Sequence, residues 1–67
     1  MRIKYDKISK NKNFYYEAIC GKYKATIYSN GNIRIEDLHF KMQIEFRHYT
    51  SVNSSKKYFK KFIDKRL

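Results

Sequence analysis

The stretch NFYYEAICGKYKATIYS (13–29) decides the fold, because it contains two alternating segments joined through a single glycine. Apolar side chains occupy every second position in 13–20 and again in 22–29, which is the period of a half-buried β-strand. Gly21 followed by Lys22 fits a two-residue type II′ hairpin turn, which takes glycine first. This turn places both apolar faces on the same side of the hairpin. The pairs predicted across it are Cys20 with Tyr23, Ala18 with Ala25, and Tyr16 with Ile27.

The loop SNG (29–31) sets the register of the next strand. Asn30-Gly31 alone favours a two-residue type I′ turn, but that turn would place Ile27 opposite Arg34 and mix polar with apolar faces. A three-residue loop with a left-handed Gly31 keeps one apolar face. We predict this loop, because one buried face constrains register more strongly than a dipeptide preference does. Its pairs are Ile27 with Ile33, Ala25 with Ile35, and Lys24 with Glu36.

The segment HFKMQIEFRHY (39–49) has the most regular alternation in the chain. The short connection through 37–39 predicts that this strand runs antiparallel to 32–37. We expect its apolar side chains to join the inward face of the earlier strands. These side chains are Phe40, Met42, Ile44 and Phe46.

The N-terminal segment 1–13 is basic and less regular. Its start has room for an edge strand through Ile3 and Tyr5, but the alternation breaks at Lys7. The following SKNKN (9–13) has the composition of a polar linker.

The closing segment 53–67 has apolar residues at helical spacing. Asn53 or a neighbouring serine can cap this helix, with Val52 just before it. A helix of about 13 residues is marginal alone in water, so its apolar stripe must cover the sheet. The stripe consists of Phe59, Phe62, Ile63 and Leu67. Lysines 57, 60, 61 and 65 point the other way.

These elements predict an α+β fold: an antiparallel meander of three or four strands over 14–49, with one C-terminal helix on one face. A chain of 67 residues cannot form two self-sufficient cores, so we expect 1–67 to be a single small domain. Cys20 is the sole cysteine, which excludes an internal disulfide and favours a reducing compartment. No signal-peptide pattern and no apolar run of about 18 residues is present, so a cytoplasmic protein with no membrane partner is expected.

Charge is the main functional signal. The formal net charge is +10, from 16 Lys and Arg against 6 Asp and Glu. Segments 1–13 and 50–67 carry most of the excess, whereas the sheet segment is nearly balanced. Lysine bias from an AT-rich genome, or a merely solvated helix face, explains such charge without any partner. Lysines outnumber arginines, which favours contact with phosphate over base reading.

The candidate binding residues follow from this distribution. We predict contacts to nucleic acid or another partner from Lys57, Lys60, Lys61, Lys65, Lys4, Lys7, Lys10 and Lys12, with Arg2 completing a basic arm. Tyr15 and Tyr28 should neighbour each other on the outer sheet face, where aromatic rings can stack on bases. The simpler interpretation is a cross-strand pair that stabilises the hairpin.

Catalysis and metal binding are not expected. His39 and His48 lie on opposite strand faces, and a zinc site needs about four convergent ligands. Glu36 and Asp37 point to opposite faces and form a poor acid–base pair. We therefore expect no enzyme activity, no cofactor and no metal.

The expected sheet and helix resemble in architecture the arm-binding domain of phage and transposon integrases, which reads the major groove with its exposed sheet. The sheet here is nearly neutral, so no functional residue is transferred. The Lys- and Tyr-rich chain with its KKYFKKF (56–62) segment resembles small phage proteins in style.

Two function classes remain. The first is a phage-type or mobile-element protein that binds the DNA or RNA backbone. The alternative is a phage-encoded inhibitor, for example of anti-CRISPR type, that docks on an acidic or nucleic-acid-binding surface of a host protein. A monomer or weak dimer fits both. Membrane binding by the helix is disfavoured, because exposing Phe59 and Phe62 would uncover the sheet.

Overall fold

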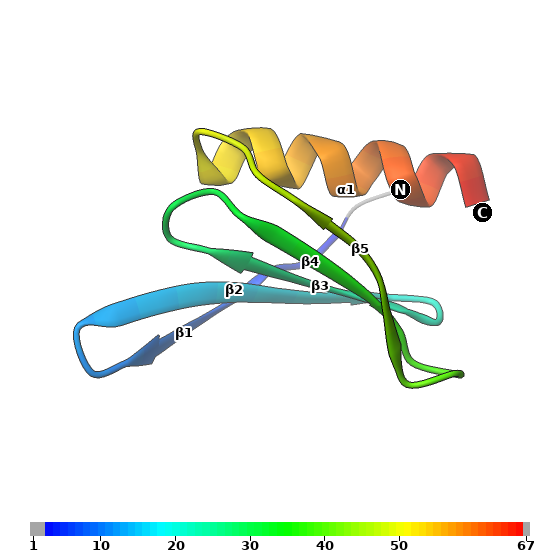
Figure 1. The fold of residues 1–67 in the computed structure, drawn as a ribbon, viewed down its shortest axis with the longest axis horizontal. Coiled ribbons are helices and arrows are strands. Elements are labelled where there is room, and N and C mark those ends of the chain that lie inside the picture. The colour runs from blue at the N-terminus through cyan, green and yellow to red at the C-terminus, as the bar shows by residue number, and fades with distance from the viewer. Residues whose placement is uncertain (1–2, 67) are drawn as a thin grey trace.

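The computed structural model describes residues 3–66 and shows one antiparallel sheet followed by one helix (Figure 1). The strands are β1 (Asp6–Lys10), β2 (Asn13–Cys20), β3 (Tyr23–Tyr28), β4 (Ile33–Asp37) and β5 (Met42–Arg47), and the helix is α1 (Val52–Arg66). The sheet order is β1-β2-β3-β4-β5, a meander in which each strand pairs with its neighbours in sequence. The helix lies along one face of this sheet. The predicted α+β class is confirmed, with five strands in the sheet.

The central hairpin has the predicted register. Cys20 pairs with Tyr23 and Ala18 with Ala25 across β2 and β3. Gly21 adopts a φ of 62°, as the first position of a type II′ turn requires.

The loop between β3 and β4 is also as predicted. Gly31 has a φ of 96°, and its amide donates to the carbonyl of Tyr28 at 2.9 Å. Ile27 pairs with Ile33, so the apolar face continues from β3 into β4. The need for one buried face, and not the turn preference of Asn30-Gly31, therefore sets the length of this loop.

The core lies between the helix and the middle strands. It consists of Ala18, Tyr23, Ala25, Ile27, Ile33, Ile35, Phe59, Phe62 and Ile63. Phe59 and Ile63 are both 0% exposed, which confirms the predicted helical stripe. Leu67, the last member of that stripe, lies outside the described residues.

A serine caps the helix. The Ser51 side-chain oxygen accepts a hydrogen bond from the Ser54 amide at 3.2 Å, an N-cap arrangement. Val52 and Asn53 lie inside the first turn. Of the two predicted kinds of cap, the neighbouring serine is correct and Asn53 is not.

The N-terminal prediction was partly wrong. An edge strand exists, but it begins at Asp6 instead of passing through Ile3 and Tyr5. The predicted linker 9–13 is the tip of the β1–β2 hairpin, where Lys10 pairs with Asn13 and Asn11 adopts a φ of 58°. Because β1 has polar residues on both faces, no apolar alternation marks it as a strand. The turn after it needs a left-handed residue, a conformation that asparagine tolerates.

The expected burial of the β5 apolar side chains was wrong, and Phe46 faces outward as the register partner of Arg34. Ile44 and Phe46 are 41% and 43% exposed, and Met42 is 55% exposed. Ile35 pairs with Glu45 and Glu36 with Gln43, so Ile44 is an extra residue in a β-bulge. Phe40 lies in the preceding turn, also exposed.

The helix explains why β5 presents polar residues inward. The Tyr58 hydroxyl donates to the Glu45 carboxylate, and the Arg47 guanidinium lies 5.2 Å from the Tyr58 ring centroid. The Tyr58 hydrogen bond, together with Arg47, lowers the pKa of Glu45 against the effect of burial. Glu45 and Arg47 thus occupy the inward side of β5 around the Tyr58 ring, and Phe46, the register partner of Arg34, faces outward. Met42, the register partner of Asp37, keeps the inward side but lies exposed at the start of the strand.

Candidate nucleic-acid interface

The predicted helix lysines share one exposed surface. Lys57, Lys60, Lys61 and Lys65 are all exposed on α1, on the side opposite Phe59. Like charges four residues apart on a helix destabilise it by about 0.2–0.5 kcal/mol per pair. Lys57, Lys61 and Lys65 form such a row, so α1 concentrates positive charge at some cost to its own stability.

The ion pairs of the described residues lie in the sheet and its turns and not on the helix. Four ion pairs occur among residues 3–66: Lys22–Asp37 at 3.8 Å, Lys24–Glu17 at 3.2 Å, Arg34–Glu36 at 3.5 Å and Arg47–Glu45 at 2.8 Å. Lys24 pairs in register with Glu36 as predicted, although its ammonium contacts Glu17. These pairs neutralise one basic residue in the β2–β3 turn and one each in β3, β4 and β5. None of them includes a helix lysine.

The four predicted N-terminal lysines are also exposed, but they do not share one face. Lys4 precedes β1, Lys7 and Lys10 lie in it, and Lys12 lies in the turn after it. Lys7 pairs in register with Tyr16 and lies on the helix side of the sheet. Lys10, three residues further, lies on the outer side, since side chains alternate along a strand. Arg2 lies outside the described residues.

Lys56 joins the two basic segments, and sequence reasoning missed it. Its ammonium lies 4.9 Å from the ring centroid of Tyr5 and 4.5 Å from that of Tyr16. The Tyr5 hydroxyl donates to the Lys56 carbonyl at 3.4 Å. Tyr16 is also the register partner of Lys7. The sequence places Lys56 one helical turn before Lys60, and this spacing could have added it to the predicted basic residues.

Tyr5 supplies a pH-dependent prediction. Burial, and then the nearby charge of Cys20, raises the pKa of Tyr5 to about 12 from an ordinary value of 10.0. The fold therefore favours the neutral phenol, and the resulting stabilisation is complete below pH 10 and lost as the pH rises towards 12. We expect the free energy of unfolding of wild type to fall more steeply over this range than that of Tyr5→Phe. Urea titrations at stepped pH measure this, and parallel curves for the two proteins would contradict it.

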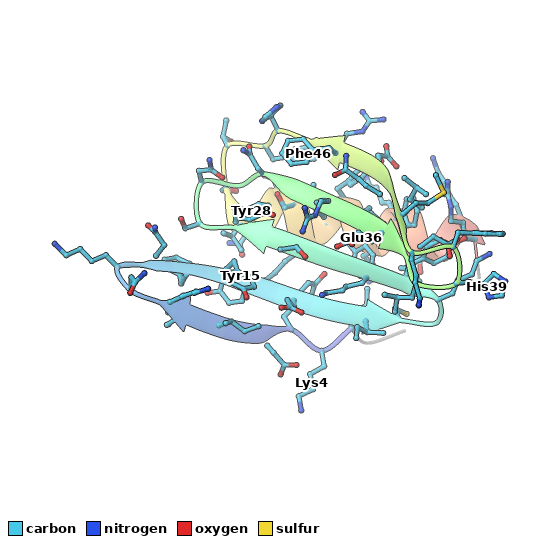
Figure 2. The ribbon with its side chains drawn as sticks, turned by 60° about the horizontal axis from the view of Figure 1, so that its bottom comes forward. Lys4, Tyr15, Tyr28, Glu36, His39 and Phe46 are labelled. Atoms are coloured by element: carbon cyan, nitrogen blue, oxygen red, sulfur yellow. The ribbon has the colours of Figure 1, made fainter. Side chains whose placement is uncertain are left out.

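The two predicted stacking residues form a pair on the other face of the sheet. Tyr15 and Tyr28 are register partners, with ring centroids 6.4 Å apart and planes tilted by 42°. Figure 2 shows both rings, with Phe46, on the face turned away from the helix. Beside them is a hollow of about 610 Å³, which Lys10 also lines. The stacking candidates and the helix lysines thus occupy opposite faces.

The residues considered for catalysis have structural contacts. The Asp37 carboxylate accepts from the amides of His39 and Phe40 at 2.8 and 3.1 Å and so holds the β4–β5 turn. Glu36 pairs with Arg34. Within residues 3–66, no group of three or more His, Cys, Asp and Glu side chains gathers as a metal site would need. The helix that the structure describes is not long and apolar enough to cross a membrane.

Comparison with protein-family models, curated proteins and solved structures found no match to this chain.

Proposed function

We propose that this protein binds the phosphate backbone of a nucleic acid through the helix lysines and the β1 segment. The observation that carries the proposal is the unequal pairing of charge. Lys24 on β3, Arg34 on β4 and Arg47 on β5 have carboxylate partners, whereas Lys57, Lys60, Lys61 and Lys65 are exposed and belong to none of the ion pairs among residues 3–66.

Lysine suits this role. Its ammonium is a point charge on a flexible stem, which fits phosphate oxygens without a fixed geometry. Each phosphate neutralised releases condensed counterions, so such binding weakens as salt rises. Through Lys56, which touches Tyr5 and Tyr16, the helix flank continues towards Lys7 on β1. The proposed surface is therefore one basic strip from α1 to β1, and it acts by binding, without catalysis.

A second candidate is supported by the exposed apolar side chains in and before β5. Leu38, Phe40, Met42, Ile44 and Phe46 are each at least 40% exposed and lie within nine residues of one another. Exposed apolar side chains that gather in one region are typical of protein interfaces. They favour an inhibitor that docks on a host protein, with the basic strip against an acidic surface. Pull-down from host lysate with and without nuclease distinguishes the two, because protein partners survive the nuclease.

A pair of double variants tests the nucleic-acid function. We expect Lys57→Gln with Lys61→Gln to weaken DNA or RNA binding and to reduce the slope of log affinity against log salt by about two, one for each phosphate contact. Glutamine keeps good helix propensity, so the fold should be unaffected. The matched control is Lys22→Gln with Lys41→Gln, which removes the same charge from two exposed turn positions.

The control should change the salt slope much less than the helix pair. Equal losses from both pairs would show that binding is not centred on the helix. If wild type binds neither DNA nor RNA at low salt, the nucleic-acid function is wrong and the protein-docking candidate takes its place.

A further inference from the structure

The outer face of the sheet has an aromatic surface that the basic strip does not use. Tyr15 on β2, Tyr28 on β3 and Phe46 on β5 all line the hollow on this face, and Figure 2 shows them spread across the sheet there. The Phe46 ring is 43% exposed. Its presence here follows from the reversed facing of β5, because an inward Phe46 would have joined the core.

The rim of the hollow is polar and free of carboxylates. Apart from its aromatic rings, it is lined by Lys10, Asn11, Asn13, Ser29, Asn30 and Asn32. The Asn32 carboxamide is held by the His48 ring, whose Nδ1 lies 2.8 Å from Asn32 Oδ1. The His48 ring in turn lies edge-on to Phe46, with centroids 5.1 Å apart. Rings, carboxamides and one ammonium thus meet at one site, and the lining has a net positive charge.

We propose that this hollow binds unpaired bases of single-stranded DNA or RNA, an inference that rests on the proposed nucleic-acid function. Flat aromatic faces stack on bases of any sequence. Carboxamides can hydrogen-bond to base edges, and Lys10 lies where a phosphate would accompany a stacked base. Bases inside a duplex are already stacked and paired, so these rings are useful only to a single strand.

The β1 strand connects this hollow with the basic strip. Lys7 faces the helix side, where its register partner Tyr16 contacts Lys56, and Lys10 lines the hollow on the other side. A single strand can therefore pass from the strip around the β1 edge to the aromatic rings. A duplex is too stiff to follow this path and would contact the strip alone.

The test compares binding of labelled oligothymidylate with binding of a DNA duplex of equal charge. We expect Phe46→Ala to weaken oligothymidylate binding by roughly 5- to 150-fold, as the loss of one stacked base implies, and to leave duplex binding unchanged. The matched control is Ile19→Ala, another outer-face position, 63% exposed, that does not line the hollow. It should change neither affinity. Circular dichroism verifies that both variants are folded.

A tryptophan variant gives a second, independent readout. The chain contains no Trp, so Phe46→Trp introduces a single tryptophan, which is excited selectively at wavelengths where tyrosine absorbs little and keeps the stacking surface. Its affinity for oligothymidylate should match wild type, and its emission should be quenched when the oligomer binds. Duplex should leave the emission unchanged.

The outcomes separate this inference from the proposed function. If Phe46→Ala leaves oligothymidylate binding unchanged, or weakens both ligands equally, the base site is wrong while the basic strip stands. If binding to the single strand depends on Phe46 but not on Lys57 and Lys61, the base site stands and the helix-centred function is wrong. If wild type binds neither ligand at low salt, both proposals are wrong.

Discussion

Phe59→Ala is expected to lower the free energy of unfolding by about 3–5 kcal/mol, the cost of removing a fully buried ring. Phe59 is 0% exposed and stacks on Phe62 with ring centroids 6.3 Å apart. Phe62 in turn lies edge-on to Tyr23, at 5.1 Å. The loss of Phe59 therefore removes a ring from the core that α1 shares with the sheet and leaves Phe62 without its stacking partner. A chain of this length has a total stability of roughly 3–10 kcal/mol, so this loss removes from about a third to all of it.

Urea denaturation followed by circular dichroism measures this cost. Phe46→Ala is the matched control, since it removes the same side chain from an exposed position, and we expect it to cost about 1 kcal/mol or less. Similar costs at the two positions would mean that α1 does not cover the sheet through Phe59.

Gly31→Ala is expected to destabilise the protein by about 3 kcal/mol or more, from the combined costs of backbone strain and overlap. The φ of 96° at Gly31 is a conformation that residues with a Cβ rarely adopt. A Cβ there would also overlap the carbonyl oxygen of Tyr49 and lie within 2.8 Å of the Ser51 nitrogen. Both obstacles are backbone atoms, so no side-chain rotation relieves them. The Gly31 carbonyl also accepts a hydrogen bond from buried Ser55, and moving the loop would break it.

Gly21→Ala is the matched control for this prediction. Gly21 also has a positive φ, 62°, but it lies in an exposed turn, so the expected cost is about 1–2 kcal/mol from backbone conformation alone. Thermal or urea unfolding of the two variants gives the comparison. Equal costs would show that the β3–β4 loop has room to move away from Tyr49 and the start of α1.

The close approach at Gly31 could not be predicted from the sequence. The loop length followed from the alternation of apolar residues on either side, and the need for a left-handed glycine followed from the loop length. That the segment before α1 packs directly on this glycine depends on where the helix lies, a long-range property of the fold. The same holds for Lys56, whose contact with Tyr5 spans most of the chain.

The candidate site also contains some residues that the sequence predicts and others that only the fold places. The exposed lysines of α1 were predictable, because helical spacing separates them from Phe59 and Ile63. The outward Phe46 was not, since the alternation of β5 has the same period whichever side faces the core. A bulge beside Ile44 and the contact of Tyr58 with Glu45 reverse the expected facing. The bulge changes the register within an otherwise regular alternation, and Tyr58 lies on a different element, 13 residues from Glu45.

The sequence by itself determined the order of the elements, the registers of the β2–β3 and β3–β4 hairpins, and the buried face of α1. These features depend on residues close in the chain, where alternation, turn length and helical spacing act directly. Only the tertiary structure decided that β1 pairs with β2 as a fifth strand, which side of β5 faces the helix, and which lysines lie next to one another. These features depend on how much of the sheet one helix can cover. A single helix leaves β5 at the margin of the core, where Tyr58, Glu45 and Arg47 fill the inner side and Phe46 faces outward.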